Sequence, residues 1–186
     1  MLRHKIALTH LNLSGRVSLN QELFKNMQQA TLVFLIKRSK KGKIAEILLA
    51  MKKRGFGKGR FNGVGGKPKK DETLPRCAVR ETKEEIGVKA GKLKKIGLIK
   101  FRFKFTPEFN QNVYFYTCEK WQNEPTESEE VKPRWFNPRK IPYKKMWPDD
   151  EFWMPLMLEG KKFGGKVVFG ENDEILKNEI AALRSQ

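Results

Sequence analysis

The sequence predicts an α+β fold in which one mixed β-sheet is flanked by helices. Apolar segments of strand length outnumber helical patterns, and no apolar run approaches the ~18 residues that cross a bilayer. The chain has 186 residues with 13 Phe and 4 Trp, which need a core to bury them and so exclude a disordered protein. Its two cysteines, Cys77 and Cys118, favour a reducing compartment over a disulfide scaffold.

The predicted strands begin with a hairpin. Residues 31–36 and 44–51 are apolar runs that a polar turn at residues 39–43 joins. At the C-terminal end, residues 166–169 and 175–180 are interpreted as a hairpin or as a strand and a helix, with the hairpin favoured. The remaining strands are expected at the alternating phenylalanines of residues 101–105, at residues 112–118 and at residues 131–136.

Two helices are expected. The first spans residues 74–86, with Thr73 as its N-cap and Gly87 as its terminating residue. The second is capped by Asp149 and ends at about residue 159. At 100° per residue, the buried face of the first helix is expected to consist of Leu74, Pro75, Ala78, Val79, Thr82 and Ile86.

Three glutamates of the first helix, Glu81, Glu84 and Glu85, fall within about 100° of one another at the edge of this face. They lie in the C-terminal half of the helix, where the macrodipole disfavours anions, and Glu81 and Glu85 repel each other across one turn. A hard cation such as Mg²⁺ or Mn²⁺ explains the cluster, because it binds carboxylate oxygens and bridges to phosphates. A solvated acidic face is the alternative.

Six glycines between residues 55 and 66 precede this helix. Glycine lets the backbone approach a phosphate closely, and Lys52 or Lys67 would supply a positive charge; an ordinary turn is the alternative. The net charge of +18 indicates an anionic partner, either nucleic acid, an acidic membrane or a phosphorylated small molecule.

The glycines and glutamates follow one pattern, the Nudix box, with its fixed positions at Gly66, Glu72, Arg80, Glu81, Glu84, Glu85 and Gly87. The chain therefore resembles the Nudix hydrolase family. The resemblance implies the Nudix fold, an α-β-α sandwich around a curved mixed sheet, over residues 28–186, with residues 1–27 as an N-terminal extension. Thr82 departs from the pattern, which prefers a bulky aliphatic residue there, and this bears on packing.

The resemblance also implies a metal site for Mg²⁺, with Mn²⁺ as the alternative. Its ligands would be the catalytic glutamates Glu81, Glu84 and Glu85, the carbonyl of Gly65, and Glu130 from a later loop. Glu129 is a rival for Glu130, one position away. The metal would neutralise a triphosphate and activate water, and the identity of the general base stays open. Arg80 and Glu72 are expected to brace the helix and the loop.

Residues 51–57, 61–67 and 146–150 resemble the branch of animal MutT homologues. That branch hydrolyses oxidised purine nucleoside triphosphates, such as 8-oxo-dGTP and 2-hydroxy-dATP, to the monophosphate and pyrophosphate. Asn110 stands where the branch has a methionine, which leaves the fine base preference open. The substrate-binding residues that the resemblance implies are Thr31, Lys52, Phe56, Asn62, Val64, Gly65, Gly66, Lys67, Phe101, Phe103, Trp147, Pro148, Asp149 and Asp150.

Within this set, three residues would read the base. Trp147 would stack on it, while the adjacent acids Asp149 and Asp150 would face its edge. Two close anions in an apolar pocket are costly, so the pair is expected to share a proton. Exchanging the roles of donor and acceptor would let one pocket read both 8-oxoguanine and 2-hydroxyadenine.

Two other functions stay open: Nudix hydrolysis of another anionic diphosphate (capped RNA or an inositol pyrophosphate), and a non-enzymatic RNA- or ribosome-binding module. The complete set of box glutamates favours an enzyme, and Asn62 together with residues 147–150 favours a purine triphosphate. We expect a cytoplasmic monomer whose remaining basic residues bind polyanions weakly. Residues 1–21 lack acids and fit an organelle transit peptide, here for mitochondria. The alternatives are a partly helical extension or an upstream start before Met27.

Overall fold

The computed structural model of the chain describes residues 27–184, so nearly all of the expected N-terminal extension lies outside the described residues. The elements follow one another as β1 (Gln28–Arg38), β2 (Ile44–Lys52), β3 (Phe61–Asn62), α2 (Leu74–Ile86), β4 (Lys89–Ala90), β5 (Leu93–Phe103), η1 (Pro107–Phe109), β6 (Gln111–Cys118), β7 (Trp121–Gln122), β8 (Val131–Phe136), η2 (Pro138–Lys140), η3 (Tyr143–Lys145), α3 (Asp150–Leu158), β9 (Phe163–Phe169), η4 (Glu171–Asp173), β10 (Ile175–Asn178) and β11 (Ala181–Ala182). Among these residues no helix is long and apolar enough to cross a membrane.

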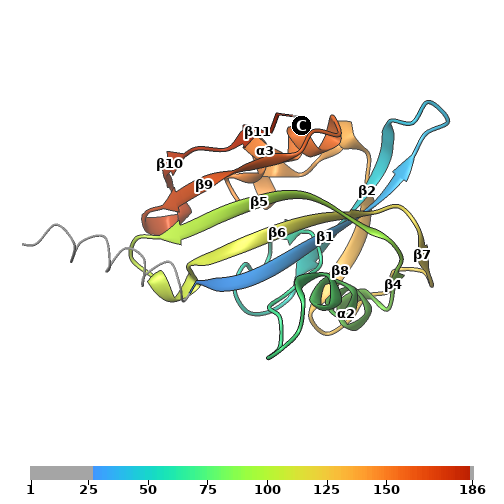
Figure 1. Cartoon of the computed structure of the whole chain (residues 1–186), viewed down its shortest axis with the longest axis horizontal. Helices are drawn as coiled ribbons and strands as arrows, with labels where there is room; N and C mark the ends of the chain where they lie inside the picture. Colours follow the sequence, from blue (N-terminus) through green and yellow to red (C-terminus); the bar gives the residue numbers. More distant parts are fainter. Residues whose placement is uncertain (1–26, 185–186) are drawn as a thin grey trace, which may run out of the picture.

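A mixed sheet organises the described part of the chain (Figure 1). Its strand order is β10-β9-β5-β6-β1-β2-β3, with β8 also paired to β2 and β11 to β9. β1 runs parallel to β6, and β5 runs parallel to β9. β9 and β10 pair antiparallel, which confirms the favoured C-terminal hairpin. The prediction of a single sheet was wrong, because β4 and β7 form a separate two-stranded sheet whose strands are too short to show a periodic pattern.

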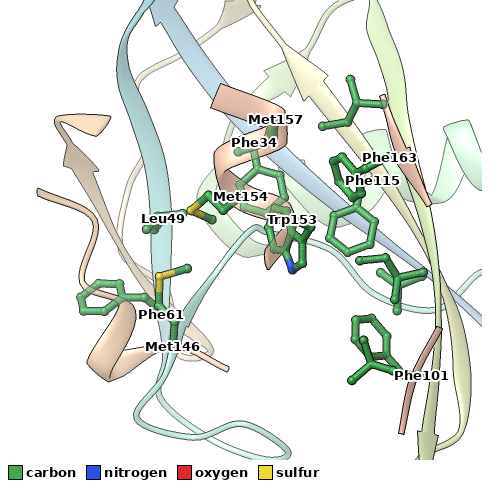
Figure 2. Close-up of a cluster of buried hydrophobic side chains, with 14 of the residues drawn as sticks. Phe34, Leu49, Phe61, Phe101, Phe115, Met146, Trp153, Met154, Met157 and Phe163 are labelled. Carbon is green, nitrogen blue, oxygen red and sulfur yellow. The ribbon is translucent and has the colours of Figure 1, made fainter. Parts of the chain in front are cut away.

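The two helices cover opposite faces of the sheet, as the strand alternation requires. Val33 and Leu35 of β1 point into the core beneath α2, whereas Phe34 points into the larger core beneath α3. Figure 2 shows this larger core, in which the fully buried Trp153 of α3 lies against Phe34 and Phe115, at centroid distances of 5.5 and 4.7 Å. The α+β sandwich with a helix on either side is therefore confirmed.

The bounds of α2 match the prediction, and its buried face matches in part, at Ala78, Thr82 and Ile86. The helix ends at Gly87 in a left-handed conformation, and Thr73 occupies the N-cap position without a capping hydrogen bond from its side chain. The helix is rotated toward the glycine-rich loop, because the Cys77 sulfur packs 3.6 Å from both the Thr31 hydroxyl and the Gly66 carbonyl. Pro75, expected inside, is exposed, and the residues actually buried are Cys77, Ala78, Thr82, Glu85 and Ile86.

The second helix starts at Asp150, directly after Asp149, which occupies the expected N-cap position. Asp149 precedes α3, but its side chain does not cap the helix. Its carboxylate instead accepts a hydrogen bond from the indole N–H of Trp153 at 3.0 Å. The side chain that the sequence assigned to a capping role is thus buried beside the core.

Candidate active site

A cavity of about 510 Å³ lies on the α3 side of the sheet, between β1, β5, β6 and the glycine-rich segment before α2. This volume is in the range of pockets that bind small molecules. One end of the cavity is lined by glycine backbone and charged side chains, and the other end by aromatic rings and two aspartates. Of the charged lining residues, four are basic (Lys52, Arg54, Arg60 and Lys67) and four are acidic (Glu85, Glu130, Asp149 and Asp150).

The glycine-rich segment is bonded to β1 like a short extra strand. The Val33 N–H donates to the Val64 carbonyl at 2.7 Å, and the Thr31 N–H donates to the Gly66 carbonyl at 2.9 Å. Between these bonds, a Cβ placed at Gly65 would lie 2.0 Å from the Thr31 carbonyl oxygen. Glycine is therefore required at this position for the loop to pack against the strand.

We expect Gly65→Ala to destabilise the protein by about 2–3 kcal/mol, because the added methyl group must push the loop off β1. Thermal unfolding measures this loss. Gly59→Ala is the matched control for adding a methyl group, since a Cβ at Gly59 meets open space, although its positive φ of 83° adds some local strain. A Gly65→Ala variant that melts with the parent would contradict the tight packing.

Glu85 is the acid that α2 places inside the cavity. It is 4% exposed, and its Oε2 accepts a hydrogen bond from the Gly65 N–H at 2.9 Å. Lys52 Nζ lies 3.5 Å from its Oε1. Burial raises the pKa of Glu85, and the nearby carboxylates of Glu81 and Glu130 raise it further against the hydrogen bond from Gly65 and the charge of Lys52. A buried carboxylate with two acidic neighbours is an environment that favours a bound cation.

The other two box glutamates of α2 are held by Arg80. Its guanidinium binds Glu72 through Nε and Nη2, at 2.9 and 2.7 Å, which confirms the expected brace between helix and loop. Its Nη1 lies 2.6 Å from Glu81 and 2.8 Å from Glu84. The hydrogen bond from Arg80 holds the pKa of Glu72 at about 2.

The carboxylates suit a hard cation in chemistry, since all are oxygen donors near one end of the cavity. Within residues 27–184, however, no three acidic, histidine or cysteine side chains converge on one point. Each acid is instead paired with a cationic side chain: Glu85 with Lys52, Glu130 with Arg54, and Glu81 and Glu84 with Arg80. The angular spacing along α2 places the glutamates on adjacent faces but does not determine where their side chains point.

At the opposite end of the cavity, Asp149 and Asp150 are each 2% exposed. Asp150 Oδ2 accepts a hydrogen bond from the Trp147 N–H at 3.1 Å. Burial raises the pKa of Asp149 to about 7, and burial together with the charge of Asp149 raises the pKa of Asp150. The positive charge of Arg60 lowers the pKa of both carboxyls and so partly opposes the effect of burial. The pair therefore holds a proton near neutral pH, in line with the expectation from adjacent acids in an apolar pocket.

Aromatic rings cover this end of the cavity. The Trp147 ring stacks on Phe56 at a centroid distance of 4.9 Å, and the guanidinium of Arg60 lies 4.2 Å from its centroid. Phe56 also stacks on Phe109 at 4.4 Å. The side-chain oxygen of Asn62 accepts a hydrogen bond from the Gly63 N–H at 2.8 Å, which orients its amide at the cavity wall.

The chain has a glycine-rich segment, then a helix that carries glutamates, packed on a mixed sheet. A comparison with protein families agrees with this arrangement. The model of the NUDIX domain matches residues 27–157. The chain belongs to the NUDIX family. The resemblance seen in the Nudix box is thereby confirmed.

Individual proteins that this chain resembles agree with the family assignment. The oxidized purine nucleoside triphosphate hydrolase of Mus musculus is 44% identical over 139 residues, which cover 75% of this chain and 88% of that protein. The protein of the same name from Danio rerio is 44% identical over 134 residues, which cover 72% of this chain and 85% of that protein. The structure titled as the MutT protein from Bacillus halodurans superposes with a TM-score of 0.71 at 18% identity, covering 83% of this chain and 97% of that one, and shows the shared fold.

The structure brings most of the predicted Nudix site residues to one cavity. Those that line it are Thr31, Lys52, Phe56, Asn62, Gly65, Gly66, Lys67, Glu85, Phe101, Phe103, Glu130, Trp147, Asp149 and Asp150. Glu130 lies there and Glu129 does not. Val64 is directed into the core beneath α2, and Pro148, in the turn before α3, is exposed outside the cavity. Glu81 and Glu84 lie beside the cavity on α2, held by Arg80.

Sequence reasoning missed three lining residues that matter chemically: Arg54, Arg60 and Phe169. Arg54 and Arg60 flank the glycine run, and a basic residue beside such a run is a detectable signal. Phe169 was assigned only to the C-terminal hairpin. Its ring stacks on Phe103 at 4.9 Å, a contact between segments far apart in the chain.

Proposed function

We propose that this protein hydrolyses oxidised purine nucleoside triphosphates, of the 8-oxo-dGTP and 2-hydroxy-dATP type, to the monophosphate and pyrophosphate. The observation that carries the proposal is one cavity with a buried pair of acids at one end and the Nudix box at the other. The relatives that are 44% identical are named as oxidized purine nucleoside triphosphate hydrolases, which supports the same substrate class.

The buried acids Asp149 and Asp150 would read the base. A carboxyl that keeps its proton donates a hydrogen bond, and its ionised neighbour accepts one. Because the raised pKa values allow the proton to sit on either acid, the pair can complement two different edges of an oxidised purine. The Asn62 amide would add one further polar contact, and the Trp147 ring an aromatic surface.

The charged end of the cavity would hold the triphosphate. Lys52, Arg54 and Lys67 line it and would neutralise phosphate oxygens beside the glycine backbone. The carboxylates of Glu81, Glu84, Glu85 and Glu130 and the carbonyl of Gly65 would hold Mg²⁺, or Mn²⁺ in its place. When bound, the metal supplies charge neutralisation and an activated water.

The protein is proposed to act as a monomer in the cytoplasm. The two free cysteines, Cys77 and Cys118, are buried as thiols that suit a reducing compartment. Light scattering would check the oligomeric state.

A substrate panel tests the function. Pyrophosphate release is measured at fixed Mg²⁺, and in parallel with Mn²⁺, from 8-oxo-dGTP, 2-hydroxy-dATP, dGTP, capped RNA and an inositol pyrophosphate. We expect kcat/KM for the oxidised purines to exceed that for dGTP by about tenfold or more, which corresponds to one or two hydrogen bonds to the base. Turnover confined to capped RNA or the inositol pyrophosphate would contradict the substrate, and no turnover of any compound would contradict the enzyme.

A further inference from the structure

Arg60 links the base end of the cavity to the C-terminal hairpin. It precedes β3, and its guanidinium carbon lies 4.2 Å from the centroid of the Trp147 ring. On the other side, its Nη2 lies 2.7 Å from Asp173 Oδ2. The two side chains of this ion pair are 29% and 32% exposed, so the pair is sheltered more than most surface pairs of this protein.

The anchor Asp173 lies in η4, which joins β9 to β10 beyond residue 157, where the family match ends. Asn172 and Asp173 both have positive φ, 52° and 62°. Two consecutive residues other than glycine in this region are strained, and such strain persists only where surrounding contacts impose it. The ion pair with Arg60, which itself lines the cavity, is one such contact.

Arg60 also acts on the acid pair. Its charge favours the ionised forms of Asp149 and Asp150 and so opposes the effect of burial on their pKa values. Tyr143 also faces Asp150: burial first, and then the charges of Asp150 and Glu151, raise the pKa of Tyr143, so it stays neutral at neutral pH. Arg60 is therefore a cation that acts on the pair from outside α3.

We propose that Arg60, anchored by Asp173, is the positioning residue of the base site: it holds the Trp147 ring in place and keeps a positive charge beside the Asp149–Asp150 pair. This inference rests on the proposed function, because it assigns the means by which the site reads a base. It makes the C-terminal hairpin part of that site, although Asp173 does not line the cavity.

Two variants of Arg60 separate the effect of its contact with the Trp147 ring from the effect of its positive charge. Arg60→Met removes the charge and keeps an unbranched stem, whereas Arg60→Lys keeps the charge and loses the planar group that stacks on the indole. We expect both to raise KM for 8-oxo-dGTP by about tenfold, with kcat within about threefold of the parent, because the cation–π contact orders the ring. Only Arg60→Met should move the pH midpoint of KM upward, by about half a pH unit or more, since it leaves the acid pair without its cation.

Asp173→Asn removes the negative charge that pairs with Arg60, and Glu119→Gln is its matched control. Glu119 forms a comparable ion pair with Arg38, at 2.8 Å, outside the cavity lining. We expect Asp173→Asn to raise KM about fivefold and to weaken the binding of 8-oxo-dGMP, measured by calorimetry without metal, by a similar factor. Glu119→Gln should change neither quantity.

The outcomes distinguish the two proposals. If the parent neither hydrolyses 8-oxo-dGTP nor binds 8-oxo-dGMP, the proposed function is contradicted. If the parent does both while Arg60→Lys and Asp173→Asn keep the parental KM and affinity, the positioning role is overturned. The test does not depend on Arg60→Met remaining folded, because the other two variants preserve charge or shape, and melting curves verify their folding.

Discussion

Glu85→Gln is expected to reduce metal-dependent release of pyrophosphate from 8-oxo-dGTP by about a thousandfold or more, through the loss of charge at the buried carboxylate. The amide oxygen of glutamine can still accept the hydrogen bond that the Gly65 N–H donates, so the loop retains its support. Steady-state kinetics at saturating Mg²⁺ measure the loss, and melting curves measure the fold.

The protein itself is expected to tolerate this change. Because burial raises the pKa of Glu85, the ionised carboxylate is costly in the folded state, and a neutral replacement should melt at or above the parental temperature. Glu46→Gln is the matched control, since Glu46 pairs with Lys37 at 3.0 Å on neighbouring strands outside the cavity lining. A Glu85→Gln enzyme with parental turnover would refute the assignment of Glu85 to the metal site.

Asp149→Asn and Asp150→Asn are expected to impair base recognition, each lowering kcat/KM for 8-oxo-dGTP by about a hundredfold. An asparagine fixes one donor and one acceptor and cannot exchange a proton with its neighbour, so the ratio of kcat/KM between 8-oxo-dGTP and 2-hydroxy-dATP should change. Kinetics with both substrates and dGTP measure this ratio. Glu151→Gln, an exposed position on the same helix, is the control. Equal losses on every nucleotide would contradict the role in reading the base.

The same substitutions are expected to increase stability at high pH. An unperturbed aspartate has a pKa of 3.8, whereas burial raises the pKa of Asp149 to about 7. The folded protein therefore binds more protons than the unfolded chain between these values, so its stability falls as the pH rises through that window. Asp149→Asn removes this dependence. Its melting temperature should exceed that of the parent at pH 8, and the difference should shrink toward pH 5.

How far the site could be predicted depends on how local its determinants are. The bounds of α2 follow from residues 73–87, where periodicity and the terminal glycine act within a few turns of one another. Its buried face was predicted only in part, because the contacts of Cys77 with Thr31 and Gly66 decide the rotation of the helix about its axis. A helical wheel contains no information on such contacts between segments.

The proposed metal site shows the same limit for the directions of individual side chains. Spacing along α2 correctly groups Glu81, Glu84 and Glu85 near one edge, since the helix has a fixed rise and turn. The direction of each carboxylate is decided by its cationic partner. Arg80 pairs with Glu81 and Glu84, and Lys52 of β2 pairs with Glu85. Those partners are known only once the strands are placed.

By itself, the sequence determined the family, the sheet flanked by helices and most of the residues around the cavity, because motifs, periodicity and turn residues act over short stretches of chain. Only the tertiary structure decided that Asp149 is buried rather than capping a helix, that Val64 faces the opposite core, and that Arg60 meets Asp173 beside Trp147. Residues 60 and 173 are far apart in the chain, and the packing of the C-terminal hairpin against β5 is what brings them together.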